Sequence, residues 1–408
     1  MTVYNDSREY QEGQAHFASS MLVAELERMF ASIPYENLLE TILRDRTRAF
    51  SPLGRPGYPL EPMLRGLLAS YYIPLRSTAQ LARRLQDDPV LAVTCGFVPG
   101  DVPHRKAFSR FQKKLGKYQH LVDQCLNQMT TELKSHLPEF GKIVAIDCTP
   151  VRSYCNGDKE PHSDREGDWI VKEGSEKKKW VFGYRLHLIV DANWELPVAK
   201  KLSLAKDNEK TATIPLLRET KVNLPWFLPD AIIADKAYDK YEHYEVITKE
   251  FSADPIIMHA KFSDSELTGS PAAPHCPAGL SLVYRSWDKN KGIQYICPEL
   301  ARKATCPLPL KCGLRTVWVK LVHDYRRFGF RIERGTEEWK ELYRKRVAVE
   351  HVNSRLKETR RLEAHCFRGY ERINMHATLS VLVMQAVALA KAKAGQMDEI
   401  RVCVRQVG

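Results

Sequence analysis

The stretch "KIVAIDCTPV", residues 142–151, decides the fold of this chain. It is an apolar, β-branched run that leads into Asp147 and then Pro150, as a buried strand ending at a sheet edge would. A second apolar run, "DAIIADKAYD" at residues 230–239, likewise passes directly into an acid, Asp235. Two buried strands that each end in a carboxylate predict a sheet with an acidic edge.

Around these two runs, strand and helix patterns alternate. The alternating or short apolar segments 180–193, 196–205 and 254–260 favour strands, and the segments 209–222 and 240–251 favour helices. Three strands followed by alternating helices and strands predict an α/β domain with a mixed sheet. The highly charged residues 155–179 are expected to form a loop.

The pattern changes along the chain predict its domain organisation. The predicted parts are a helical N-terminal DNA-binding domain over 1–138, a first core part over 139–260, an inserted, partly β, cysteine-containing subdomain over 261–335, C-terminal core helices over 336–395 and a tail over 396–408. The apolar run 377–390 is interrupted by Ser and Gln and is shorter than the roughly 18 residues of a membrane span, so a buried helix is expected.

The charge balance favours a polyanionic partner. Among 408 residues, 62 are Lys or Arg and 50 are Asp or Glu, which gives a net charge of +12. One basic amphipathic helix is predicted from residue 105 onward, and its candidate DNA contacts are Arg105, Lys106, Arg110 and Lys113. Such a cluster is either a solvated helix face or a set of phosphate contacts, and the segment alone favours neither.

The cysteines and the N-terminal residues bear on the compartment. No basic-then-apolar segment typical of a signal peptide opens the sequence. The ten cysteines are therefore not expected to form a disulfide framework, and a reducing cytoplasm is the expected location.

A third acid lies in "ELYRKRVAVEHVNSRLKE", residues 341–358, where a continuous helix is expected. At about 100° per residue, Tyr343, Arg346, Glu350 and Lys357 fall within an arc of roughly 60° and span about 21 Å. This face could follow a nucleic-acid backbone with Glu350 at a metal. The alternative is a solvated helix on which Arg346 and Glu350 form an i,i+4 pair.

Asp147, Asp235 and Glu350 together suit magnesium chemistry. Taken singly, an acid at a strand end is usually a turn or cap residue. Mg²⁺ prefers hard oxygen ligands, and two ions about 3.5 to 4 Å apart can activate a water or a 3′-hydroxyl for phosphodiester cleavage. Asp239 is a rival to Asp235, which is preferred because it directly ends the apolar run.

The spacing Tyr-x2-Arg-x3-Glu-x6-Lys, filled by Tyr343, Arg346, Glu350 and Lys357, resembles the signature of bacterial insertion-sequence DDE transposases. "AIDCTPVRS" and "IIADKAYD" resemble the two catalytic strands of their RNase H-like core. The stretch from "YPLEPMLRGLLASYY" to "VPHRKAFSRFQKKL" resembles the helical domain that precedes this core, and "CFRGYERINMHATLSVLVMQAVALA" resembles its closing helices.

This resemblance implies an enzyme that acts on double-stranded DNA, both transposon ends and target, as a homodimer in a synaptic complex, away from membranes and near the bacterial nucleoid. Asp147, Asp235 and Glu350 would bind two Mg²⁺ ions, with Mn²⁺ as a substitute, and Tyr343, Arg346 and Lys357 would contact phosphates. The DNA would be cut and its 3′-hydroxyl ends joined to a target. An inactive DNA-binding relative and a nuclease that joins no strands are the alternatives.

In relatives with this signature, cleavage can pass through a DNA hairpin, with an aromatic of the inserted domain stacked on a flipped base. Trp287 and Trp318 are candidates for that role, although core packing is the commoner fate of such residues. In the same region, Cys276, Cys297, Cys306 and Cys312 are separated by 20, 8 and 5 residues. They form either a structural zinc site or four free thiols, because no Cys-x2-Cys pair decides between these.

Overall fold

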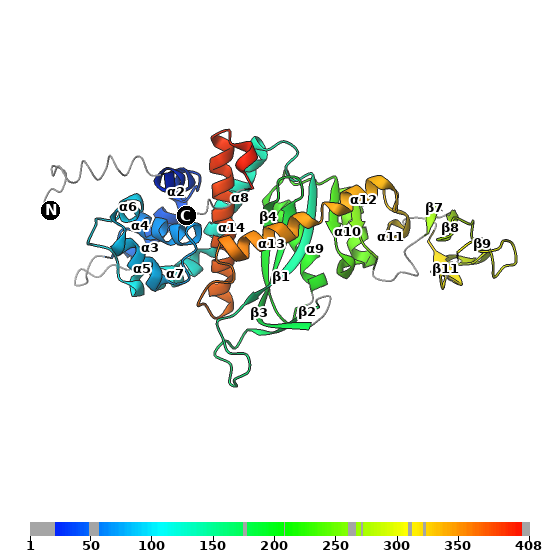
Figure 1. The fold of residues 1–408 in the computed structure, drawn as a ribbon, viewed down its shortest axis with the longest axis horizontal. Coiled ribbons are helices and arrows are strands. Elements are labelled where there is room, and N and C mark those ends of the chain that lie inside the picture. Colours follow the sequence, from blue (N-terminus) through cyan, green and yellow to red (C-terminus); the bar gives the residue numbers. More distant parts are fainter. Residues whose placement is uncertain are drawn as a thin grey trace.

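The computed structural model describes residues 21–48, 57–173, 178–207, 209–259, 267–270, 272–308, 312–320 and 324–401. Figure 1 shows an elongated arrangement along the longest axis. Helices from the N-terminal part lie at one end, a twisted sheet lies in the centre, and small strands lie at the other end.

The N-terminal part is helical, as the sequence predicts. Its elements are α2 (Met21–Ala31), α3 (Glu36–Arg48), α4 (Leu60–Tyr72), α5 (Thr78–Asp87), α6 (Pro89–Thr94), α7 (Arg105–Leu115), the 3₁₀ turn η1 (Gly116–Tyr118) and α8 (Gln119–His136). The single helix expected from residue 105 onward is divided by η1. On α7, Phe108 and Phe111 are buried and the cations lie outside, which is the amphipathic pattern that the sequence predicts.

The central sheet is mixed. Its strands are β1 (Ile143–Arg152), β2 (Asp168–Glu173), β3 (Lys178–Asp191), β4 (Leu196–Leu204), β5 (Ala231–Ala234) and β6 (Asp254–Ile257). β3 pairs antiparallel with β1, β2 and β4, whereas β5 lies parallel to both β1 and β6. β5 and β6 are buried at every position, as expected for parallel strands. The helices α9 (Glu209–Asn223) and α10 (Tyr241–Phe251) connect the later strands.

The prediction that residues 155–179 form a loop is wrong in part, because β2 lies within this segment. β2 pairs with the first half of β3, from Asp168 opposite Gly183 to Glu173 opposite Lys178. A charged segment can form such a strand because an edge strand needs only one paired neighbour and can keep polar side chains in water.

The prediction of one continuous helix over residues 341–358 is also wrong. The structure has α12 (Glu337–Arg344) and α13 (Val347–Thr359), joined by a tight turn in which the amides of Lys345 and Arg346 bond to carbonyls three residues back. α12 buries Trp339, whereas α13 buries Val349 and Val352. In a straight helix Val349 and Val352 would point about 80° and 140° away from Trp339, so the tight turn lets all three side chains reach the interior.

The last α-helix among the described residues is buried. α14 (Tyr370–Lys393) follows the short α11 (Tyr325–Phe328), α12 and α13, and precedes the 3₁₀ turn η4 (Met397–Glu399). By length and composition α14 is the described helix apolar enough to cross a membrane, but 94 % of its most apolar window is buried inside the protein. It packs against α8 and β4, so the predicted buried helix is confirmed.

The remaining strands form a small β region over residues 267–320. They are β7 (Thr268–Ser270), β8 (Ala273–His275), β9 (Val283–Asp288), β10 (Gly292–Ile296) and β11 (Thr316–Val319). These strands pair only with one another, in a sheet of three and a sheet of two. Leu267, Tyr295, Val317 and Val319 belong to a hydrophobic cluster that is separate from the main core.

Buried polar contacts join the helical part to the C-terminal helices. The guanidinium of Arg361 lies 4.6 Å from the ring centre of Tyr71 and donates to Ser70 Oγ at 2.7 Å. The hydroxyl of Tyr71 hydrogen-bonds to His376 Nδ1 at 2.8 Å, and His376 lies 4.5 Å from His365, ring centre to ring centre. Burial, and next the charge of Arg361, lowers the pKa of His365 to about 4.

This histidine predicts loss of stability in acid. The folded pKa of His365 lies below the usual value of 6.5, so its contribution is present above pH 6.5 and is lost as the pH falls toward 4. We expect the free energy of unfolding to lose roughly 2 to 3 kcal/mol between pH 7 and pH 4.5 from this group alone. Denaturant titrations of His365→Gln should show a shallower acid dependence, whereas exposed His120→Gln should match the wild type. Equal acid dependence in all three proteins would contradict this account.

Asp239 supplies a second stability prediction. Its fully buried carboxylate takes two bonds of 2.7 Å from Arg326 and one of 3.1 Å from the hydroxyl of Tyr244. Asp239→Ala leaves Arg326 buried without this partner, so we expect about 3 to 5 kcal/mol of destabilisation in denaturant titrations. The matched loss of an exposed carboxylate, Glu245→Ala, should cost less than about 1 kcal/mol. A stable Asp239→Ala protein would show that the pair is dispensable.

Candidate active site

Asp147, Asp235 and Glu350 line one open cavity of about 1130 Å³. They come from β1, from the residue after β5 and from α13, which are separated by more than 200 positions at the extremes. The sheet and α13 therefore bring together the three acids that the sequence selects.

The parallel pairing of β1 with β5 places the two aspartates side by side. Ile146 lies opposite Ala234 in the ladder, so Asp147 and Asp235 are the next residues of the two neighbouring segments. The expectation that Asp147 ends its strand is wrong, because β1 stays paired with β3 as far as Arg152, whereas Asp235 does follow the end of β5. Such strands lie about 4.8 Å apart. At the end of β5, the carboxylate of Asp235 accepts a 2.7 Å bond from the amide of Ala237 and so begins a 3₁₀ turn, η2 (Lys236–Tyr238).

Asp239, the rival to Asp235, lies elsewhere. Its carboxylate is buried beside Arg326 and does not line the cavity. One turn of chain thus separates an acid at the cavity from an acid in the interior. The sequence favoured Asp235 because it directly ends the apolar run, but it could not show that Asp239 is buried against Arg326, which is 87 residues away.

Two contacts set the position of α13 over the acids. Val349 and Val352 are fully buried on its inner face, where α13 packs on β1 and β3. Asn353 donates its side-chain amide to Asp147 Oδ2 at 3.3 Å. Asn353 stands three residues after Glu350, on the same side of the helix, and this spacing is the signal by which it could have been found.

Arg346 and Glu350 form an ion pair at the cavity, as the i,i+4 alternative expects. Burial lowers the pKa of Arg346, but the nearby charges of Glu350 and Asp147 and the hydroxyl of Tyr343 raise it above its ordinary value. Burial raises the pKa of Tyr343 above its ordinary value; the charge of Arg346 opposes this and the charges of Asp235 and Glu350 add to it, so this hydroxyl keeps its proton. Tyr343 stacks on Trp339 with ring centres 5.3 Å apart.

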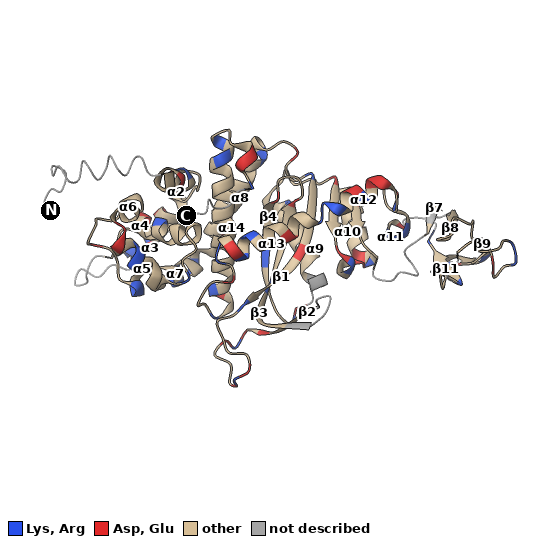
Figure 2. Ribbon diagram, viewed as in Figure 1, with Lys and Arg blue, Asp and Glu red and all other residues tan. Residues whose placement is uncertain are grey.

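Cations are distributed among these acids. Lys357 lines the cavity and pairs with Glu363 at 2.8 Å, and Arg185 and Lys236 line it as well. Figure 2 shows basic and acidic residues interleaved along α13. Arg185 was not selected from the sequence, because only the β1–β3 pairing brings it beside Pro150 and so to this cavity.

The acids offer the hard oxygen ligands that Mg²⁺ prefers, so the donor chemistry fits a divalent metal. They line one cavity, but in the conformation seen here they do not form a metal-binding group, and no three His, Cys, Asp or Glu side chains of the described residues do so. Glu350 is paired with Arg346 instead, and its side chain is 52 % exposed. A metal would therefore require Glu350 to exchange Arg346 for the ion.

The described residues contain no group of ligands that would support the zinc hypothesis. Cys276 and Cys297 are buried, Cys306 and Cys312 are half-buried, and all four belong to the described residues in which no metal-binding group forms. Cys276 packs in the hydrophobic cluster of the small β region, and Cys312 lies against it. These two therefore have the packing role of the free-thiol alternative.

The two tryptophan candidates lie in the small β region as well. Trp287 on β9 is 61 % exposed, and Lys291 lies 5.7 Å from the ring centre of Trp318 on β11. Neither lines the cavity of the three acids, and Figure 1 places β9 and β11 at the far end from α13.

The N-terminal cations are divided between two faces of α7. Arg105 and Lys113 line a second cavity, of about 380 Å³, together with residues from α5 and α14. Lys106 and Arg110 are exposed on the adjoining face of the same helix. Arg105 and Lys113 therefore line a cavity that the sequence did not predict.

Comparison with known proteins agrees with this arrangement. Residues 138–385 match the family model described as "Transposase DDE domain", and residues 14–114 match the one described as "Transposase domain (DUF772)". A search of curated proteins finds none that matches this sequence. The DDE match covers more than half of the 408 residues and contains β1, β5 and α13. The chain therefore belongs to the insertion-sequence DDE transposases.

Proposed function

We propose that this transposase binds the terminal inverted repeats of its element, cleaves DNA by two-metal phosphodiester hydrolysis and joins the freed 3′-hydroxyl ends to target DNA. A single observation carries the proposal: the three acids line one cavity whose other charged residues include Arg185, Lys236, Arg346 and Lys357. Acids suit metal ions and cations suit phosphates, and a cleavage site needs both.

In this proposal Asp147, Asp235 and Glu350 hold two Mg²⁺ ions, for which Mn²⁺ can substitute. When bound, these ions supply Lewis-acid stabilisation of the phosphate and a more acidic water or 3′-hydroxyl. Asn353 orients Asp147 through its 3.3 Å bond, and Tyr343 supplies a protonated hydroxyl beside Arg346. The mixed sheet supports an RNase H-like assignment for this core.

Arg346 and Lys357 are assigned to DNA phosphates. Each is now neutralised by an acid, Glu350 and Glu363 respectively. A phosphate bound to Arg346 would free Glu350 from this ion pair, and Glu350 would then be available as a metal ligand. Arg suits this exchange because its planar guanidinium binds a phosphate through two parallel hydrogen bonds.

The wider assignments follow from the same proposal. Two transposon ends require a homodimer in a synaptic complex, and a DNA substrate places the enzyme in the cytoplasm at the nucleoid. An RNase H-like nuclease would cut but not join strands. Pre-cleaved end DNA, Mg²⁺ and a supercoiled target separate these two functions, because only a transposase yields joined products.

The carboxylates give the direct test. We expect Asp147→Asn, Asp235→Asn and Glu350→Gln each to lower Mg²⁺-dependent nicking of end DNA by at least about 100-fold, because each removes a charge that holds a metal. DNA affinity measured without metal should stay within a few-fold of the wild type. The readout is mapping of the cut positions, including any hairpin product.

Glu358→Gln is the matched control, since Glu358 lines the same cavity outside the proposed triad. It should retain nicking. Unchanged nicking in Asp147→Asn and Glu350→Gln would exclude the assigned metal site, whereas intact DNA binding without nicking in the wild type would favour an inactive relative.

A further inference from the structure

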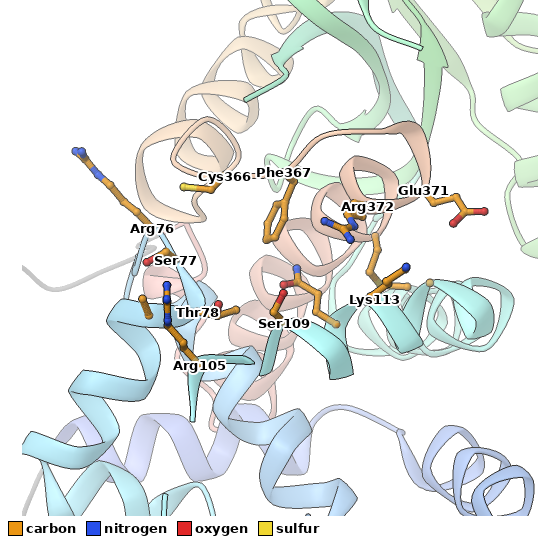
Figure 3. Close-up of a pocket in the computed structure, with 14 residues that line it drawn as sticks. Arg76, Ser77, Thr78, Arg105, Ser109, Lys113, Cys366, Phe367, Glu371 and Arg372 are labelled. Carbon is orange, nitrogen blue, oxygen red and sulfur yellow. The ribbon is translucent and has the colours of Figure 1, made fainter. Parts of the chain in front are cut away.

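A second cavity lies between the helical part and the C-terminal helices. Its volume is about 380 Å³, and its walls come from the start of α5, one face of α7, the segment before α14 and the first turns of α14. In Figure 3, Arg105, Ser109 and Lys113 rise from α7, while Cys366 and Phe367 lie across from them. Parts of the chain almost 300 residues apart thus enclose one space.

This second cavity is strongly basic. Arg76, Arg105, Lys113 and Arg372 line it, and Glu371 is the acid among the lining residues. All four cations are exposed, and within the described stretches of chain none of them has an ion pair. At the catalytic cavity, by contrast, Arg346 and Lys357 are both neutralised. Four cations and one acid around a concavity favour an anion with several charges.

Neutral donors complete the lining. Ser77, Thr78 and Ser109 bring hydroxyl groups, and Ser77 caps α5, a helix of 10 residues whose N-terminal turn borders the cavity. Arg105, Ser109, Gln112 and Lys113 lie on one side of α7. The buried amide of Gln112 donates to Tyr71 at 3.2 Å, which fixes this part of the wall to α4.

The same segment of chain also borders the catalytic cavity. Glu358 and Glu363 line the catalytic cavity, and Cys366 and Phe367 line the second one. Glu363 and Cys366 are three positions apart, a span of at most about 11 Å. At about 3.4 Å per nucleotide along a DNA strand, that span corresponds to roughly three nucleotides.

We propose that the second cavity binds the phosphodiester backbone of the DNA strand a few nucleotides from the cleavage site, and so sets the distance of the cut from that contact. This inference rests on the proposed function, because it takes DNA as the ligand. A free phosphate ion shares the chemistry and is the other source to be distinguished.

The cysteines provide a footprint in the unmodified protein. Cys366 is exposed at the second cavity, Cys148 is half-buried at the catalytic cavity, and Cys306 is half-buried in the small β region. A mixed-sequence duplex of about 30 base pairs, without metal, should slow alkylation of Cys366 and Cys148 by iodoacetamide but not of Cys306. Peptide mass spectrometry reads all three rates. Inorganic phosphate at the same phosphate concentration should protect none of them.

The pattern of cysteine protection distinguishes the possible conclusions. Protection of Cys148 without Cys366 overturns the second-cavity proposal and leaves the proposed function standing. Protection of neither cysteine by the duplex contradicts the proposed function itself. Protection of Cys366 by inorganic phosphate as strongly as by the duplex assigns the cavity to a free anion and overturns the DNA proposal.

Charge variants give an independent measurement. Arg105→Glu and Arg372→Glu should each weaken duplex binding by about tenfold, and each should reduce the number of counterions released on binding by about one. Glu371→Gln should tighten binding, because it removes the acid. Arg44→Glu, an exposed arginine of the helical part that lines neither cavity, is the matched control. All these positions are exposed, so thermal melting should change little. Binding by Arg105→Glu and Arg372→Glu that equals binding by Arg44→Glu overturns the proposal.

Discussion

The parallel pairing of β1 with β5 is the constraint on which the candidate active site depends. Both strands are wholly apolar up to their acids, so they are stable only in the middle of the sheet, covered on both faces. Once Ile146 is opposite Ala234, the next residue of each segment is an aspartate, Asp147 within β1 and Asp235 directly after β5. Like charges at such spacing repel each other, which is a cost that a bound cation would offset.

The repulsion between Asp147 and Asp235 is partly offset by positive charge already at the cavity. Arg346 lies close enough to Asp147 and Glu350 for both acids to raise its pKa. Asn353 offers Asp147 a hydrogen bond without charge. Arg346 and Asn353 therefore both stabilise the carboxylate of Asp147 at this cavity. The tight turn at Lys345 and Arg346 is part of this arrangement, since it lets α12 and α13 bury different faces while Arg346 stays at the cavity.

The helical part is tied to this site by a short, densely packed segment. Arg360 and Arg361, directly after α13, are among the largest fully buried side chains of the described chain, and each lies over a tyrosine ring of α4. A buried guanidinium is costly to desolvate, so the aromatic faces and the hydroxyl of Ser70 are needed to hold it. The segment that follows α13 thus connects α13, α4 and α14, and movement of any one of these helices relative to the others would disturb this packing.

The sequence by itself determined the elements with a strong local signal. The apolar runs into Asp147 and Asp235, the mixed order of strands and helices, and the buried character of α14 all follow from side-chain periodicity, which is a property of neighbouring residues. The spacing of Tyr343, Arg346, Glu350 and Lys357 resembled a family signature, and the family itself is shown by the matches to the two transposase domains. Only the tertiary structure decided which of Asp235 and Asp239 lies at the cavity, where the helix at residues 341–358 is interrupted, and that β2 forms within a charged segment. It alone joined Arg105 to Arg372 around one cavity. These features depend on partners tens to hundreds of residues away, and no local pattern records which distant side chain will neutralise, bury or face a given residue.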